Sequence, residues 1–246
     1  MRPDAQRKTL DRALSRAGIC SRTVARQWIV GGRVRVNGAL VLDPERWVHP
    51  DRDRLSVDGR RVEEQARVYL ALNKPKGYLT SHGDPSERRT VYDLITDLDP
   101  WVVPVGRLDR DTSGLLLLTN DTEWAERIAS PEQHVSKTYR AQVSPRIEEA
   151  DLERLRAGVE LEDGPTRPAR VARLRDAGGT SILELTISEG RNRQVRRMLR
   201  EVGAKVRSLK RVAIGDLELG DLASGAWRHL VAGEVAGLQR RPSREP

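Results

Sequence analysis

The sequence predicts an α+β protein, in which a mixed, largely antiparallel sheet forms the larger domain and a small helix-rich domain precedes it. Three observations support this class. Apolar residues recur at helical spacing between residues 9 and 31. Short alternating runs bounded by turn signals follow directly. Beyond residue 68, strand-like and helix-like segments are mixed without the regular β-α-β rhythm of a parallel sheet.

The first domain is expected to begin with two helices in residues 9–31. Gly18 separates two apolar sets, and Ser21 is a candidate N-cap of the second helix. The apolar positions are Leu10, Ala13, Leu14 and Ala17, then Val24, Ala25, Trp28 and Ile29. Arginines decorate both helices, Arg22 and Arg26 among them. Such a basic face suits an anionic partner, and a solvated charged surface is the alternative.

A small hairpin should complete this domain. Val34-Arg35-Val36 alternates like a strand, and Asn37-Gly38 is a strong hairpin-turn signal. A second short strand is expected at about 54–58, where Asp58-Gly59 supplies another turn signal. Two helices and a hairpin within about 60 residues make a compact module with its basic face on the helices.

A boundary near residues 63–65 divides the chain into domains at residues 8–66 and 67–239. The apolar run at 68–72 opens the second domain as a strand and leads into the basic turn Asn73-Lys74-Pro75-Lys76-Gly77. Further strands are expected at 115–119, 137–143, 169–174, 181–188 and 205–214. Helices are expected at 90–95, 122–129, 148–157 and 192–202.

Positive charge is concentrated in two segments of the chain. The 246 residues carry 44 Lys and Arg against 36 Asp and Glu, a net charge of +8. Residues 1–67 and 191–211 are both strongly basic, whereas the rest is near neutral or acidic. Two separate basic segments fit one long polyanion better than one small anion.

Several classes of protein are not expected. Cys20 is the single cysteine, so no intrachain disulfide is possible. The start of the chain lacks the apolar stretch of a signal peptide, and no stretch approaches the ~20 apolar residues that span a bilayer. The histidines are scattered and no nucleotide-binding glycine loop is present. We therefore expect a cytoplasmic monomer that crosses no membrane and needs no metal or other cofactor.

The most informative segment is residues 106–121, in which a glycine-bounded polar loop precedes four leucines. The leucine run predicts a strand buried on both faces, and a loop anchored to such a strand can hold a reactive carboxylate. Three aspartates compete for that role. Asp121 is more simply a helix cap and Asp111 a turn residue. Asp109 is the remaining candidate, with an ordinary loop carboxylate as its alternative.

A second informative segment, residues 188–203, predicts a helix that Asn192 caps at its start and Gly203 at its end. Its apolar face consists of Val195, Met198, Leu199 and Val202. Arg196 lies nearest this face, so it is the best candidate for an ion pair with a site carboxylate. Arg193, Arg197 and Arg200 lie nearly opposite and suit phosphates, or simply form a solvated basic face.

These segments resemble the motifs of a known family. Gly106-Arg107-Leu108-Asp109, followed by Thr112-Ser113-Gly114 and the leucines, is similar to the signature motif of ribosomal pseudouridine synthases of the RsuA/RluB type. Residues 189–199 resemble their late motif, Lys137-Thr138-Tyr139 the motif between, and 73–77 the opening turn. The likeness runs from about residue 68 to 238, and the residues before it resemble an S4-like RNA-binding domain often fused to these enzymes.

The resemblance implies an isomerase that converts a specific uridine of ribosomal RNA to pseudouridine, in the large rather than the small subunit. Asp109 would be the catalytic carboxylate, Tyr139 the active-site aromatic, and Arg196 the arginine paired with Asp109. Arg107 would fill the stack that the target base vacates or hold the adjacent phosphate. From sequence alone, a core position in a strand is the alternative for Tyr139. The other RNA-binding candidates are Arg22, Arg26, Lys74, Lys76, Arg191, Arg193, Lys210 and Arg211.

Two other functions compete with this interpretation. One is a non-catalytic RNA-binding protein of the same fold. The other is a metal-dependent nuclease that uses Asp109, Asp111 and Asp121. Such a site needs carboxylates that converge within a few ångströms, and Asp121 is expected at the far end of the buried strand.

Overall fold

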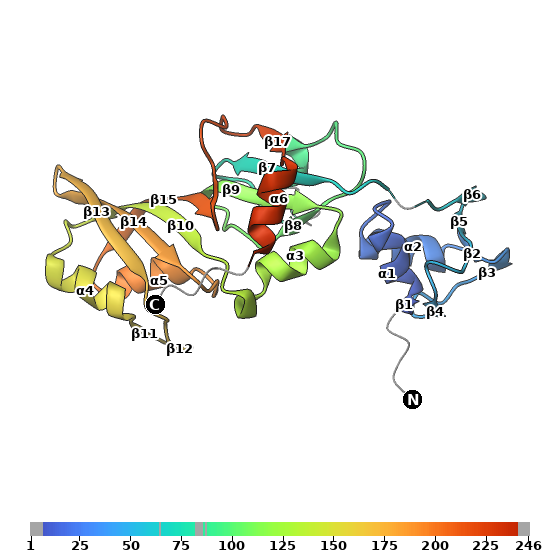
Figure 1. Cartoon of the computed structure of the whole chain (residues 1–246), viewed down its shortest axis with the longest axis horizontal. Helices are drawn as coiled ribbons and strands as arrows, with labels where there is room; N and C mark the ends of the chain where they lie inside the picture. The colour runs from blue at the N-terminus through green and yellow to red at the C-terminus, as the bar shows by residue number, and fades with distance from the viewer. Residues whose placement is uncertain (1–6, 64, 82–85, 87, 241–246) are drawn as a thin grey trace. The chain divides into compact units, whose positions relative to one another are not determined.

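The computed structural model describes residues 7–63, 65–81, 86 and 88–240, which form two compact units (Figure 1). The first unit comprises the described residues up to Val68, together with Asp97–Val103 and Thr119–Thr122. The rest of the described chain forms the second unit. Helices and a largely antiparallel mixed sheet occur together, so the predicted α+β class is confirmed.

The first unit packs two helices and small sheets around one apolar core. Its helices are α1 (Leu10–Arg16) and α2 (Arg22–Val30). The four-stranded sheet has the order β3 (Ala39–Leu40), β2 (Val34–Val36), β5 (Leu55–Val57), β6 (Arg60–Arg61), and β1 (Lys8–Thr9) pairs with β4 (Trp47–Val48). The Ser21 hydroxyl accepts a hydrogen bond from the Val24 amide at 3.2 Å, so the predicted N-cap is confirmed.

The second unit is built on a nine-stranded sheet. Seven strands follow the order β13 (Arg170–Ala177), β14 (Thr180–Ile187), β10 (Lys137–Ser144), β15 (Lys205–Ile214), β9 (Ser113–Thr119), β7 (Tyr69–Lys74), β17 (Trp227–His229). Two short strands lie off this path: β16 (Leu217–Glu218) pairs with β15, and β8 (Val103–Val105) pairs with β9. The strands β11 (Glu160–Leu161) and β12 (Gly164–Pro165) form a separate hairpin. Neighbouring strands run antiparallel from β13 through to β15, and β15 then pairs in parallel with β9.

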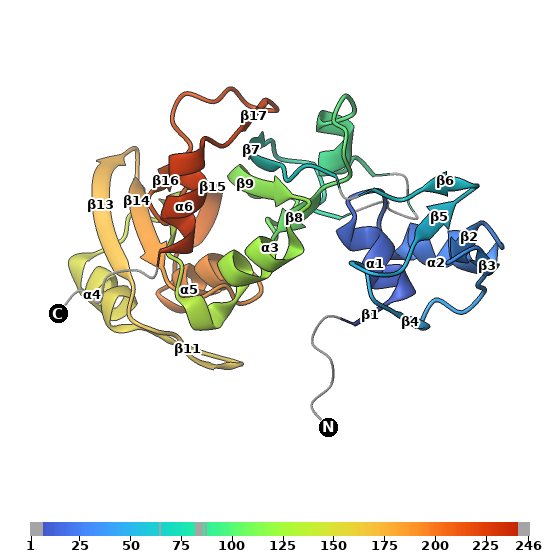
Figure 2. The ribbon, with the colours of Figure 1, turned by 45° about the vertical axis from the view of Figure 1, so that its right-hand side comes forward.

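Two apolar clusters divide this sheet into halves. Helices α4 (Glu149–Ala157) and α5 (Gln194–Glu201) cover the half formed by β13, β14, β10 and β15. Helices α3 (Thr122–Ala129) and α6 (Ala232–Gln239) lie side by side over the half that contains β9 and β7 (Figures 1 and 2). Short 3-10 turns, Val91–Leu94 and Pro131–Gln133, complete the described elements.

The halves join where β9 lies parallel to β15, and this junction requires a glycine. Ser113 pairs with Lys210 and Gly114 with Arg211. Gly114 has φ +105°, and a Cβ at this position would meet the Arg211 carbonyl oxygen at 2.1 Å. The next four residues of β9 are leucines with no exposed surface, as the sequence predicts.

The pairing of β15 with β10 contains a register shift that decides which side chains face the same way. Thr138 pairs with Ala213, but Tyr139 pairs with Arg211, so Val212 is an extra residue on β15. An extra residue moves the following side chains of a strand to the opposite face. Arg211 therefore shares a face with Tyr139, and it is buried, whereas Lys210 is exposed.

Candidate active site

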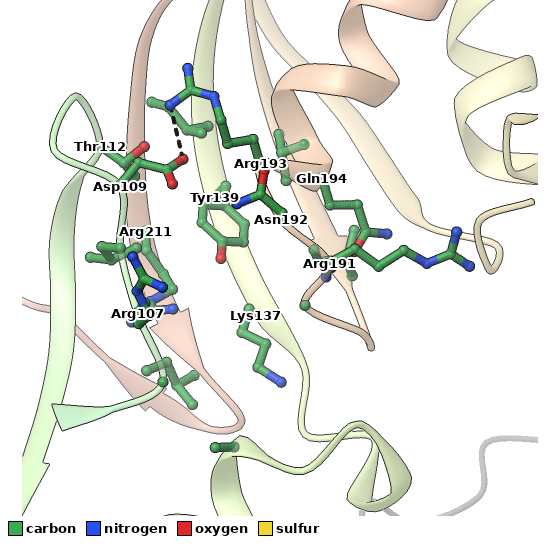
Figure 3. Close-up of a pocket in the computed structure, with 18 of the residues that line it drawn as sticks. Arg107, Asp109, Thr112, Lys137, Tyr139, Arg191, Asn192, Arg193, Gln194 and Arg211 are labelled. Carbon is green, nitrogen blue, oxygen red and sulfur yellow. Dashed lines mark hydrogen bonds and ion pairs between the residues drawn. The ribbon is translucent and has the colours of Figure 1, made fainter. Parts of the chain in front are cut away.

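A pocket of about 400 Å³ opens where the two halves of the sheet meet. It is lined by the 105–112 loop after β8, the first residues of β10, residues 190–195 before and within α5, and β15. Figure 3 shows Asp109 at one end, Tyr139 in the middle and Lys137 at the other end. Its size is typical of sites for small molecules or single groups of a larger ligand.

The backbone around Asp109 is fixed by side chains from outside its loop. The Lys74 ammonium donates hydrogen bonds to the carbonyl oxygens of Asp109 at 3.0 Å and Thr112 at 2.8 Å. The Thr80 hydroxyl donates to the Leu108 carbonyl at 2.8 Å, and Leu108 itself is buried. The Asp109 side chain remains 31% exposed. A rigid backbone with an accessible carboxylate is what a reactive group requires.

Lys74 was predicted to hold a phosphate, and the structure shows that this prediction is wrong. Lys74 has no exposed surface, and its ammonium donates to the backbone carbonyls of Pro75, Asp109 and Thr112. Burial lowers the pKa of Lys74 to about 8, although the charges of Asp109 and Asp111 act in the opposite direction. Lys74 is the last residue of β7, and its side chain points into the protein interior. Its ammonium therefore stabilises the 109–112 loop by hydrogen bonds to the loop backbone.

The ion pairs at the loop differ from the predicted ones. Arg193, not Arg196, is the arginine that contacts Asp109, with 3.5 Å between Nη1 and Oδ2. Arg193 also binds Asp111 with two hydrogen bonds of 3.1 Å. Arg196 is only 14% exposed, as its place on the helix predicts, but it contacts Asp111 at 3.2 Å and the Thr112 hydroxyl at 3.3 Å. The predicted pair of Arg196 with Asp109 is replaced by this network.

The backbone at the start of α5 explains why Arg193, rather than Arg196, contacts Asp109. The helix begins at Gln194, and Arg193 is its N-cap residue in the left-handed conformation, with φ 48°. Asn192, the predicted cap, lies one residue before it. Gly203 follows the end of the helix with φ +76°, as a C-terminal glycine does. The left-handed residue turns the Arg193 side chain toward the 109–112 loop (Figure 3).

Asp111 has a lowered pKa because of these arginines. Burial alone would raise the pKa of this carboxyl group, but the hydrogen bonds from Arg193 and the charges of Arg196 and Arg193 outweigh burial. Asp111 thus anchors both arginines. Asp109, which shares only the longer contact with Arg193, keeps its carboxylate free to face the pocket.

Two basic side chains from β15 and β10 line the pocket. Arg211 lies near Tyr139 (Figure 3), with its Nε donating to the Leu115 carbonyl at 2.7 Å. Lys137 also lines the pocket, and its Cα partners on the flanking strands, Ile187 and Ile214, are pocket residues too. Burial and the charge of Arg211 lower the pKa of Lys137 to about 8. Lys137 was not among the predicted site residues, although its spacing of two from Tyr139 places both on one strand face.

The other predicted phosphate ligands of this unit fall into two groups. Arg107 and Lys76 are exposed, and Arg107 lines the pocket, so both remain available. Arg191 is directed away from Asp109 (Figure 3), and its guanidinium donates to the carbonyls of Gly164 and Pro165. Arg191 therefore braces the β11–β12 hairpin, while Lys210 lies exposed on the strand face opposite Arg211.

In the first unit, a buried carboxylate organises the basic helix face. Asp11 has no exposed surface and accepts hydrogen bonds from Arg22 at 2.8 Å and Arg26 at 2.9 Å. Burial would raise the pKa of Asp11, but hydrogen bonds from Thr9 and these arginines lower it to about 2. Both arginine side chains remain about half exposed, so each presents donors to solvent.

The metal-dependent nuclease alternative requires Asp121 as a metal ligand, but Asp121 is engaged elsewhere. Asp121 accepts a hydrogen bond from Arg67 at 2.8 Å, within the first compact unit. In the part of the chain that the structure describes, no three acidic, histidine or cysteine side chains gather as metal ligands. Among the described helices, none combines the length and apolar character needed to cross a bilayer.

A carboxylate on a fixed loop faces a pocket that basic side chains line, and this arrangement suits an anionic substrate. Residues 68–201 match the family described as RNA pseudouridylate synthase, and residues 8–53 match the S4 domain. The chain belongs to the RNA pseudouridylate synthase family of isomerases and carries an S4 domain at its N-terminal side. The resemblance expected from the motifs is thereby confirmed.

Several relatives span nearly the whole chain. An uncharacterized RNA pseudouridine synthase of Aquifex aeolicus (strain VF5) is 44% identical, over 93% of this chain and 92% of the relative. The ribosomal large subunit pseudouridine synthase B of Bacillus subtilis (strain 168) is 40% identical, over 94% and 95%. The crystal structure of a pseudouridylate synthase superposes with a TM-score of 0.67 at 32% identity, covering 94% of this chain and 99% of that one.

Proposed function

We propose that this protein converts a specific uridine of large-subunit ribosomal RNA to pseudouridine, with Asp109 as the reactive carboxylate. Relatives from Bacillus subtilis (strain 168) and Vibrio cholerae serotype O1, 40% and 38% identical, are both named ribosomal large subunit pseudouridine synthase B. One observation carries the chemical part of the proposal. The backbone of Asp109 is fixed by a hydrogen bond from Lys74, and its carboxylate is exposed at one end of a pocket that Tyr139 lines in the middle.

The reaction breaks the bond between uracil N1 and ribose C1′ and rejoins the ring to the same ribose carbon through uracil C5. The target nucleotide must first leave its stack to enter the pocket. Asp109 would then act at the sugar, either as a nucleophile or as a base. Tyr139 would stack on the uracil, and its hydroxyl could carry the proton that leaves C5.

The surrounding cations would hold the RNA. Arg107 is exposed at the pocket and would occupy the vacated stack or bind the adjacent phosphate, and Lys76 would bind a neighbouring phosphate. Arg22 and Arg26 of the S4 domain would dock RNA outside the pocket, since their exposed donors lie on one helix face.

Replacement of Asp109 by Asn tests the proposal. Ribosomal RNA with tritium at uracil C5 releases tritium when pseudouridine forms. Asp109→Asn should lower this release by at least about 1,000-fold, as loss of a nucleophile or base does in other enzymes, and should still bind the RNA. Asp151→Asn is the matched control, because Asp151 lies on α4 and pairs with Arg154 outside the pocket. Undiminished release by Asp109→Asn would show that another group does the chemistry.

A further inference from the structure

We propose that Lys137 and Arg211 form a cationic subsite that binds the carbonyl edge of the uracil ring while it is detached from the ribose. The inference rests on the proposed function, because it assigns the part of the pocket that receives the base. Lys137 lies at the end away from Asp109, and Arg211 lies near Tyr139, between the two ends (Figure 3).

Arg211 has an unused donor inside the protein. The residue is 4% exposed, and its Nε already donates to the Leu115 carbonyl. Its Nη2 is buried and has no hydrogen-bond partner among the described residues. A buried N–H of a charged group without an acceptor is costly. Such a group is expected where a ligand supplies the acceptor.

Lys137 adds a second charge without a counter-ion. Its ammonium makes no hydrogen bond or ion pair with any residue in the described part of the chain. The pocket residues Ile187 and Ile214 flank it on the neighbouring strands, which removes water from its surroundings. Two cations in one partly apolar space attract an anion more strongly than either does on an open surface.

The position of the pair favours a base over a phosphate. A backbone phosphate would meet the accessible cations first, and these are Arg107, which is exposed, and Arg193, which is 44% exposed. Arg211 is reached only by a group that enters the pocket. Tyr139 and Arg211 are directly paired across β10 and β15, so a flat ring stacked on Tyr139 brings its edge to the guanidinium.

The chemistry supplies the anion. If Asp109 attacks C1′, a carboxylate–carbon bond forms and the N1–C1′ electron pair leaves with uracil. If Asp109 instead removes the C2′ proton, a C1′–C2′ double bond forms and the same electron pair leaves with uracil. Both routes yield a uracil anion whose charge is shared by N1, O2 and O4. Preorganised cations at the carbonyl oxygens stabilise that species without rearrangement. The ring then turns and C5 bonds to C1′, as the carboxylate–C1′ bond breaks in the first route or as C2′ takes back its proton in the second. The C5 proton leaves, and N1 takes up a proton.

Single-turnover rates with saturating enzyme, RNA affinity and melting temperature test the subsite. Lys137→Met keeps the side-chain length, and Arg211→Gln removes the guanidinium. Each should lower the rate by about 100-fold, the usual cost of one preorganised donor at a developing anion, with RNA affinity within about twofold of the wild type. Arg211→Lys keeps the charge and should recover most of the rate. Arg140→Gln is the matched control, because Arg140 adjoins Tyr139 but is exposed outside the pocket.

Each outcome decides something. A wild-type rate for Lys137→Met and Arg211→Gln, both with unchanged melting temperature, would overturn the subsite. Weaker RNA affinity with an unchanged saturated rate would also overturn it and assign the pair to a phosphate. If Arg211→Gln has both a lower rate and a lower melting temperature, Lys137→Met decides. The subsite is supported when Lys137→Met has a lower rate at an unchanged melting temperature, and it is overturned when Lys137→Met keeps the wild-type rate. An inactive wild-type protein would instead reject the proposed function.

Discussion

The role of a single side chain at this site depends mainly on whether its polar atoms are buried or exposed. Lys74 is buried beneath the Asp109 loop, and Lys76, two residues later, is exposed. The sequence shows two lysines in one basic turn, and a charge count treats them alike. Their roles separate only because β7 runs to Lys74 and ends there. Position relative to the strand end, rather than residue type, places one beneath the loop and leaves the other exposed to solvent.

Lys74→Met should therefore damage catalysis rather than binding. It removes the donors to the carbonyls of Pro75, Asp109 and Thr112. A reactive group displaced by about 1 Å can lose about 100-fold in rate, so we expect a loss of that order in the single-turnover rate at saturating enzyme.

Lys76→Met provides the contrast. It should weaken RNA binding and lower the slope of log affinity against log salt by about one, with the saturated rate retained. The same rate loss for both variants would contradict the distinction between a buried support and an exposed phosphate ligand.

The arginines near Asp109 show what a helical wheel can and cannot predict. Spacing correctly placed Arg196 closest to the buried face, and it is 14% exposed. It did not predict that Arg193 adopts a left-handed conformation and takes the contact with Asp109. A wheel assumes helical dihedral angles throughout, and the last residue before a helix does not follow them.

At the scale of elements, the close contact of β9 with β15 holds the two halves of the catalytic sheet together. Four buried leucines predicted β9 well, because a short run that is apolar on both faces is typical of a central strand. Its parallel partner was not predictable, since β15 lies far along the chain and its pairing depends on long-range packing. Gly114 is required because a side chain there would clash with the backbone of Arg211, and this reason becomes visible only when β15 is in place.

Gly114→Ala should strongly destabilise the second unit. The new Cβ would lie 2.1 Å from the Arg211 carbonyl oxygen at a φ of +105°, so we expect a loss of about 3 kcal/mol or more in unfolding free energy. Gly237→Ala on α6 is the control, since a Cβ at that position would meet no described atom within 4 Å.

Urea denaturation measures both changes. The control should gain up to about 1 kcal/mol, as alanine does over glycine in a helix. Equal stabilities for Gly114→Ala and the wild type would show that the strands can separate without cost.

For the whole molecule, charge distribution predicted more than net charge. The excess of +8 alone fits many proteins, but two separate basic segments indicated one long polyanion. One segment became the S4 helix face and the other the α5–β15 wall of the pocket. The sequence could not predict that part of this charge is internal, with Arg211 buried and Arg191 bound to a hairpin.

The salt dependence of RNA binding should report the contribution of the S4 helix face. Asp11→Asn, Arg22→Gln and Arg26→Gln in one protein remove the two cations without leaving a buried carboxylate unpaired. Relative to Asp11→Asn alone, the slope of log affinity against log salt should fall by about two. Filter binding across a salt series measures it. Identical slopes would mean that these arginines do not contact phosphate.

The extra residue Val212 gives the backbone control over which of two neighbouring basic side chains enters the catalytic pocket. Lys210 and Arg211 differ by one step in the chain, and strand alternation sends them to opposite sides. If Val212 instead paired with Tyr139 in a regular ladder, Arg211 would lie opposite Arg140 and point away from the pocket, and Lys210 would point into it. An alignment of a homologue that misplaces a gap by one position near Val212 would therefore identify the wrong basic residue as the one that points into the pocket.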